Sequence, residues 1–219
     1  MHTCIRTTLI CCLILVMAAA ISARDDNSLS RSLPDASFQL EDATIAEAVG
    51  SLSQHYGVPF GLIKSVLDDG STRINLKVVN ERLDNVLMLV HRQTSTYEWR
   101  FADGVVLVEP ATTERELLRE LAMTVIPRFS SKAGITKREL RVILLGTIEL
   151  KEFFKANGLR LPEFEVVNDY ERQTPLYEEI LMTGASLMDI LNYVVRRGPD
   201  KIWSITFNRD ERKLVNVIF

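Results

Sequence analysis

A pattern of apolar positions followed by a tryptophan occurs twice along the chain. In each copy, four aliphatic residues spaced as on one helix face precede an arginine and then a tryptophan in a predicted strand. Because all six positions match at one constant offset, the sequence predicts an internal duplication of a small unit. The first copy consists of Leu83, Val86, Leu87, Val90, Arg92 and Trp99, and the second of Leu187, Ile190, Leu191, Val194, Arg196 and Trp203.

The first copy lies in a predicted unit that spans residues 37–110. The unit opens with a short strand and continues into a helix, for which Thr44 and Glu47 form a capping box and Gly57 provides the stop. Apolar residues of this helix recur at the spacing of one face. We therefore expect the helix to pack on a core through that face.

The rest of this unit alternates strands with a second helix. A strand over residues 58–62 would lie near the edge of a sheet, because Pro59 cannot donate a ladder hydrogen bond. After an alternating strand comes a helix over residues 81–93 with Asn80 as its N-cap, and then a hairpin whose turn is Asp103–Gly104. The predicted order is strand, helix, strand, strand, helix, strand, strand, which is an α+β fold.

Seven short stretches of this unit together form a recognisable pattern of core positions. They are Phe38–Leu40, Thr44–Val49, Leu52, Gly57–Val58, Ile74–Asn80, Leu83–Leu87 and Gly104–Pro110. This pattern resembles the secretin and TonB short N-terminal domain, abbreviated STN. The sequence departs from the commoner family pattern at Val49 and at Val86–Leu87, which replace Ala-Leu pairs. The resemblance implies a periplasmic module of two helices and two sheets that binds other proteins and catalyses nothing.

Residues 123–219 are predicted to form a second, degenerate unit of the same type, joined to the first by a linking helix within 111–122. Its second half repeats the pattern, with a strand over 177–182, a helix over 186–197 that ends at Gly198–Pro199, and two closing strands. Its first half is longer and more helical than in the first copy. The apolar residues expected to contribute there are Leu140, Ile143, Leu144, Ile148, Phe153 and Phe154.

The N-terminus has the layout of a secretory signal peptide. Arg6 precedes an apolar run that ends in small residues, so we expect cleavage after Ser22 or Ala23 and a polar leader over 24–36. A retained membrane anchor is the alternative, but the apolar run would reach only about 20 Å, against about 30 Å for a hydrocarbon core. All 3 cysteines lie within residues 1–23. We therefore expect a periplasmic or secreted protein whose mature chain has no thiol, and whose signal segment contacts membrane only during export.

No residue pattern typical of an enzyme occurs in the sequence. His55 and His91 lie on different predicted helices without partners at metal-ligand spacing, and the adjacent acids Glu178–Glu179 would point to opposite faces of a strand. Trp99 and Trp203 lie in alternating strands, which favours packing in a core. We expect no catalytic residue, cofactor or metal. A formal net charge of −3 with interspersed signs also argues against nucleic-acid binding.

These observations favour an exported protein-interaction module of the bacterial envelope, with a secretin, a TonB-dependent receptor or a regulator as its partner. An exposed strand edge can accept a strand from a partner, and the last strand, over 213–219, is the predicted edge. The candidate partner-binding residues in this strand are Lys213, Val215 and Val217. Two alternatives remain open: a small-ligand sensor that binds between the two units, and an enzyme without a recognisable motif.

Overall fold

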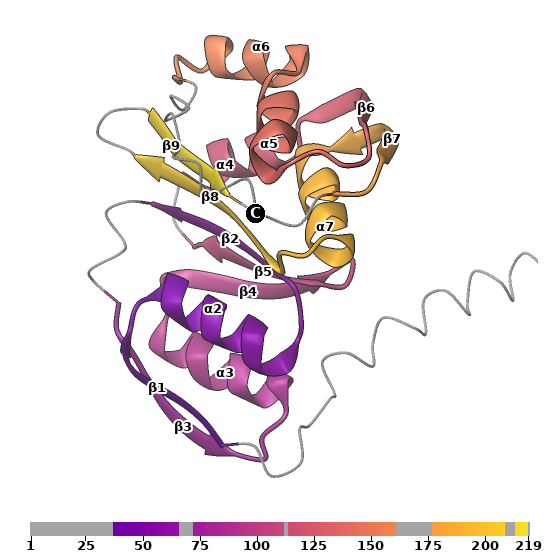
Figure 1. Cartoon of the computed structure of the whole chain (residues 1–219). Coiled ribbons are helices and arrows are strands. Elements are labelled where there is room, and N and C mark those ends of the chain that lie inside the picture. Colours follow the sequence, from indigo (N-terminus) through magenta and orange to yellow (C-terminus); the bar gives the residue numbers. More distant parts are fainter. Residues whose placement is uncertain (1–36, 66–71, 112–113, 161–176, 209–212, 219) are drawn as a thin grey trace, which may run out of the picture.

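The chain has an α+β fold, which confirms the predicted fold class (Figure 1). The predicted signal peptide and polar leader, residues 1–36, lie outside the part of the chain that the structure describes. The computed structural model describes residues 37–65, 72–111, 114–160, 177–208 and 213–218.

The first unit contains seven elements, and their order confirms the predicted order. They are β1 (Ser37–Ala43), α2 (Ile45–Tyr56), β2 (Phe60–Ser65), β3 (Ile74–Val79), α3 (Leu83–Gln93), β4 (Tyr97–Ala102) and β5 (Val105–Pro110). β1 and β3 form a two-stranded antiparallel sheet. The helices α2 and α3 lie between this sheet and the strands β2, β4 and β5 (Figure 1).

Several local signals start and end these elements as predicted. The Thr44 hydroxyl accepts a hydrogen bond from the backbone N–H of Glu47, and the Glu47 carboxylate accepts one from the N–H of Thr44. Gly57 ends α2 with a φ of 66°. Asp103 and Gly104 have φ values of 52° and 76°, the positive values that a two-residue hairpin turn of type I′ requires.

Two local predictions are wrong. The helix α3 begins at Leu83 with Arg82 as its N-cap, so Asn80 is not the cap. Instead, Asn80 has a φ of 54° and lies in the connection between β3 and α3. Pro59 does not place β2 at an edge, because β2 begins one residue later and pairs in parallel with β5 on one side and β8 (Ile202–Asn208) on the other. The missing N–H of Pro59 therefore costs the ladder no hydrogen bond.

The second unit repeats two antiparallel strand pairings of the first. β6 and β7 pair antiparallel as β1 and β3 do, and β8 and β9 pair antiparallel as β4 and β5 do. Two helices, α5 and α6, stand where the first unit has α2. The elements are α4 (Glu114–Ala122), β6 (Val125–Ser131), α5 (Lys137–Leu145), α6 (Ile148–Ala156), β7 (Ile180–Ser186), α7 (Leu187–Arg197), β8 and β9 (Lys213–Ile218).

The expected apolar residues of the helical half are not all buried. Leu140, Leu144 and Phe154 are buried in the core of the second unit. Ile143 and Ile148, however, are 38% and 68% exposed. Their helical spacing alone therefore predicted more core than the two short helices supply.

The two units share one five-stranded sheet with the strand order β4-β5-β2-β8-β9, and a hydrophobic core lies on each face. Along β5, Val106 and Val108 belong to the core of the first unit, whereas Val105 and Leu107 belong to the core of the second. A strand covered on both faces is expected to be continuously apolar, as this one is. The predicted linking helix forms as α4, and its buried Leu118 contributes to the second core.

Most of the repeated positions are equivalent in burial, and one is not. The first, second and fourth aliphatic positions of the pattern are buried in both copies. The third position is Leu191 in the second copy, which is fully buried, and Leu87 in the first, which is only partly buried. The tryptophans differ as well, since Trp203 is 1% exposed and Trp99 is partly buried.

Trp203 joins the second unit to the central strand. Its indole lies so close to Gly61 of β2 that an added Cβ at Gly61 would be 2.3 Å from Trp203 Cζ2. The indole N–H donates to Oδ1 of Asn192 on α7 at 2.8 Å, and Asn192 is itself fully buried. The absence of a side chain at Gly61 is therefore what lets the indole pack closely on the sheet.

Candidate functional site

The predicted partner-binding strand, β9, lies at one end of the five-stranded sheet. The side chain of Val217 is fully buried, so this residue could meet a partner only through its backbone. The side chains of Lys213 and Val215 lie outside what the structure describes. The register between β8 and β9 shifts beside Phe207, which leaves Val215 as an extra residue in a β-bulge. Bulges commonly twist sheet edges away from further pairing, so β9 is a less regular edge than its sequence suggests.

The opposite end of the same sheet is formed by β4, whose pairing with β5 has no register shift. The backbone N–H of Ala111 donates to the C=O of Thr96 at 2.7 Å, which fixes the phase of the ladder. Hydrogen-bonded and non-hydrogen-bonded positions alternate along an antiparallel pair. The backbone N–H and C=O groups of Trp99 and Phe101 therefore point away from β5, toward the open side of β4.

Tyr97 is the third residue of β4 whose backbone groups point away from β5, and residues at the end of α3 bind these groups. The N–H of Tyr97 donates to the C=O of Thr94 at 2.8 Å, and its C=O lies 3.1 Å from Nδ1 of His91. The open part of the edge is thus short and centred on Trp99 and Phe101.

The two faces of β4 next to this open edge differ in chemistry. Trp99 and Phe101 are partly buried against the first core. On the other face, Arg100 forms an ion pair of 2.7 Å with Glu109, whose side chain is 7% exposed, and its guanidinium lies 3.9 Å from the sulfur of Met188. A strand added to β4 would therefore meet aromatic side chains on one face and the ion pair of Arg100 with Glu109 on the other.

The residues considered for chemistry in the sequence have structural surroundings. His55 lies against the rings of Phe38 and Tyr56, with centroid distances of 4.9 and 4.8 Å. Glu178 and Glu179 are both exposed. No group of three or more His, Cys, Asp or Glu residues that could hold a metal ion occurs among the described residues. No helix in the described ranges is long and apolar enough to cross a membrane.

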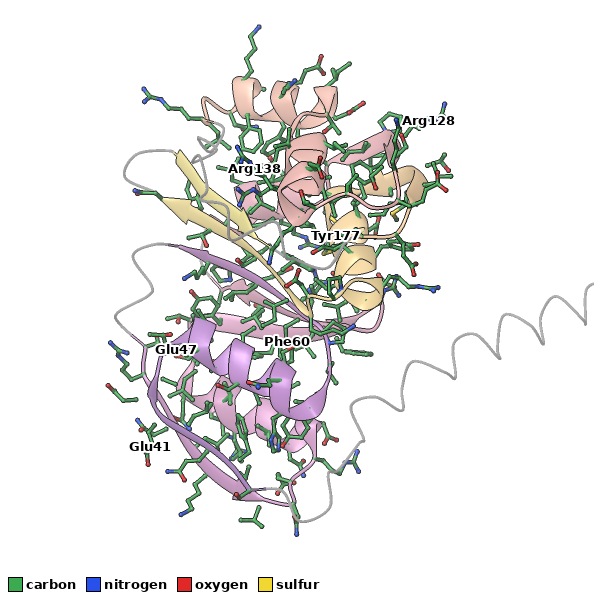
Figure 2. The ribbon with its side chains drawn as sticks, viewed as in Figure 1. Glu41, Glu47, Phe60, Arg128, Arg138 and Tyr177 are labelled. Carbon is green, nitrogen blue, oxygen red and sulfur yellow. The ribbon has the colours of Figure 1, made fainter. Side chains whose placement is uncertain are left out.

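A pocket of about 290 Å³ lies in the second unit, beside the N-terminal end of β7 and the C-terminal end of α7. Its apolar lining comes from Ile180, Val194 and Pro199, together with the rings of Tyr177 and Tyr193. Figure 2 shows Tyr177 beside α7, on the opposite side of the five-stranded sheet from Phe60. Sequence reasoning missed this pocket, because its two sides are separated along the polypeptide and neither carries a known motif.

The hydroxyl of Tyr177 is held in place beneath this pocket. It donates to Oδ2 of Asp200 at 2.6 Å, and the ammonium group of Lys137 pairs with Oδ1 of Asp200 at 3.2 Å. Burial raises the pKa of Tyr177 well above its ordinary value, and the hydrogen bond to Asp200 and its charge raise that pKa further. Tyr177 therefore stays protonated at neutral pH and serves as a hydrogen-bond donor. The ring also needs Gly198, since an added Cβ there would lie 2.8 Å from it.

A second hollow, of about 390 Å³, lies where the two units meet. Gly50, Ser53 and Gln54 of α2 line one side, and Asp200 and Lys201, which precede β8, line the other. Asp200 therefore borders this hollow, and its carboxylate also accepts the hydrogen bond from Tyr177 of the first pocket.

Comparison with protein-family models gave no match, and comparison with curated proteins gave none either. Among solved structures, a crystal structure described as a proposed anti-sigma factor from Parabacteroides distasonis aligns with 36% of this protein at 17% identity, with a TM-score of 0.31. The alignment covers 35% of that protein, about a third of its length. A TM-score this low supports no inference about the function of the present protein.

Proposed function

We propose that the protein is an exported protein-interaction module of the bacterial envelope and that residues 37–110 are an STN-like domain. The support comes from the layering of the first unit, in which two helices lie between two sheets, as the resemblance implies. The repeated pairing of β6 with β7 and of β8 with β9 extends this support to the second unit. The partner is a secretin, a TonB-dependent receptor or a regulator.

The observation that carries this proposal is the open edge of β4. The outward N–H and C=O groups of Trp99 and Phe101 have no described strand beside them. Such groups form a template on which an extended segment of another protein can add as a further strand. Because Trp99 and Phe101 are aromatic, an extended segment that places apolar residues on their face of β4 fits this edge.

Both ends of the sheet are candidate docking sites, and each requires its own variant. The open side of β4 has an unbroken register, whereas β9 carries the bulge at Val215. Phe101→Pro removes an outward N–H without breaking a bond to β5, and Phe101→Ala removes the same ring while it keeps that N–H. Val215→Pro is the change that tests β9.

The experiment is a capture assay with the protein that begins at residue 24. The parent and the three variants are immobilised, exposed to envelope extract from the native host, and the bound proteins are identified by mass spectrometry. We expect the parent and Phe101→Ala to capture the same envelope partner, and Phe101→Pro to capture at least about tenfold less. Circular dichroism and thermal unfolding check first that each variant is folded.

Equal capture by all four proteins would remove both strand edges from the proposal. Loss with Val215→Pro alone would move the site to β9 and to the residues Lys213, Val215 and Val217. Turnover of a substrate by the purified parent would overturn the interaction role itself.

N-terminal sequencing of the protein from its host checks the compartment, and a protein that retains Met1 in the cytoplasm would contradict export.

A small-ligand sensor is the second candidate function, and the hollow between the two units is the observation that favours it. The hollow brings side chains of α2 together with Asp200 and Lys201. A ligand there would contact both units at once. A neighbouring gene for a secretin, receptor or regulator would favour the docking role, whereas a metabolic gene cluster would favour the sensor.

A further inference from the structure

We propose that the pocket beside β7 and α7 binds a free α-amino acid with an apolar side chain. The proposal stands independently of docking at a sheet edge, because the pocket lies in the second unit and includes no residue of β4 or β9.

The size and lining of the pocket indicate which apolar group it can hold. Its volume of about 290 Å³ lies at the small end of ligand sites, which commonly measure about 300–1,000 Å³. The exposed Pro199 and the partly buried ring of Tyr193 provide contacts for a hydrocarbon or aromatic group, whereas Ile180 and Val194 are each only 2% exposed. This volume leaves room for a whole amino acid the size of leucine or phenylalanine.

Two charged residues of opposite sign line the same pocket. Glu178 precedes β7, and Arg197 is the last residue of α7. Both are exposed, and among the described residues neither has an ion pair or hydrogen-bond partner, the other included. A guanidinium group recognises a carboxylate, and a carboxylate recognises an ammonium group. A free α-amino acid supplies both charges on one carbon next to its side chain.

The lining is held in place before any ligand arrives. The hydroxyl of Tyr177 is fixed by Asp200, and Asp200 is in turn paired with Lys137. The ring of Tyr177 packs against Gly198, where a side chain would collide with it. A site with fixed walls loses less conformational entropy on binding than a mobile one.

The C-terminus of a polypeptide offers a carboxylate beside an apolar side chain as well, but it lacks the free ammonium group at the same carbon. The shared chemistry is therefore the carboxylate bound by Arg197 and the apolar group in the pocket. Glu178 favours the free amino acid over the peptide terminus, because only the free amino acid has an ammonium group at that carbon. A ligand whose ammonium group is blocked therefore distinguishes the two kinds of ligand.

The test is isothermal titration calorimetry of the protein from residue 24 with L-phenylalanine and L-leucine, up to about 10 mM. N-acetyl-L-phenylalanine lacks the ammonium group, L-phenylalaninamide lacks the carboxylate, and glycine lacks the side chain. Adjacent residues provide matched controls, since Arg196 and Glu179 are also exposed but do not line the pocket.

We expect saturable binding of phenylalanine or leucine and none of glycine. Arg197→Gln should weaken binding about tenfold or more, and Glu178→Gln should weaken it for the free amino acid but not for its N-acetyl form. Arg196→Gln and Glu179→Gln should change it less than about twofold.

Three results would overturn the proposal. The first is the absence of saturable binding of either amino acid to the parent. The second is equal weakening by Arg197→Gln and Arg196→Gln, which would mean that only overall charge matters. The third is tighter binding of N-acetyl-L-phenylalanine than of L-phenylalanine, which would assign the pocket to a peptide terminus instead of a free amino acid.

Discussion

Truncation of the leucine at the third repeated position tests how tightly the two copies of the pattern are packed. Leu191 is fully buried in the core of the second unit, whereas its counterpart Leu87 is only partly buried at the border of the first core. Replacement of a buried leucine by alanine loses the transfer free energy of the removed carbons and adds the cost of a cavity, together about 2–5 kcal/mol. At Leu87 part of that surface already meets water, so we expect Leu87→Ala to cost only about 1–2 kcal/mol.

The assay is urea unfolding of the parent, Leu191→Ala and Leu87→Ala, followed by tryptophan fluorescence and by far-ultraviolet circular dichroism. The protein has 2 tryptophans, and Trp99 reports on the first unit while Trp203 reports on the second. Because the two units share one sheet, we expect the fluorescence and the circular dichroism to change together in one unfolding transition. A loss of about 3 kcal/mol would lower Tm by about 6–12 °C in a protein of this size.

The ranking of the two variants matters more than either value. Leu191→Ala must be the more damaging change if burial decides the cost. A loss below about 1 kcal/mol for Leu191→Ala, or a greater loss for Leu87→Ala, would contradict the packing described for the repeat. Two separate unfolding transitions would contradict the shared sheet as the unit of cooperativity.

Two further changes test contacts around the central strand and the pocket. Gly61→Ala should lower the free energy of unfolding by at least about 1–3 kcal/mol, because the new Cβ would lie 2.3 Å from Trp203 Cζ2, and the tryptophan emission should shift; a variant as stable as the parent in thermal unfolding would contradict this contact. The pKa of Tyr177 is raised in the folded protein, so its stabilising contribution is complete below the unfolded value near 10 and decreases as the pH rises above it. The difference in unfolding free energy between the parent and Tyr177→Phe should therefore shrink between about pH 9 and pH 11 in urea titrations, and a constant difference would contradict a buried phenol.

Much of the local structure could be predicted because its causes are local. The capping box of Thr44 and Glu47 supplies hydrogen bonds within a single turn, and the Asp103–Gly104 turn fixes its hairpin through the backbone angles of two residues. The two wrong predictions concern residues that are each compatible with two local structures. Asn80 can cap a helix or adopt positive φ, and Pro59 can lie in an edge strand or just before a central one.

The candidate sites depend on contacts between distant segments, and the sequence identified them only in part. The closing strand was predicted as an edge, but the bulge beside Phe207 appears only when β8 and β9 are paired. The open side of β4 follows from the phase of its ladder with β5 and from its place at the end of the sheet. The pocket brings together Tyr177 and Arg197, which lie before β7 and at the end of α7, and these two residues are 20 positions apart along the polypeptide.

The sequence by itself determined the α+β class, the order of elements in the first unit and the recurrence of one apolar pattern in two helices, since periodicity and turn chemistry act over a few residues. Only the tertiary structure decided that the two units share one sheet, with Gly61 beneath Trp203 and a core on each face. The physical reason is that pairing of β2 with β8 depends on which apolar surfaces meet across a long separation in sequence. A continuous apolar strand shows that both of its faces are covered, but it does not show by what.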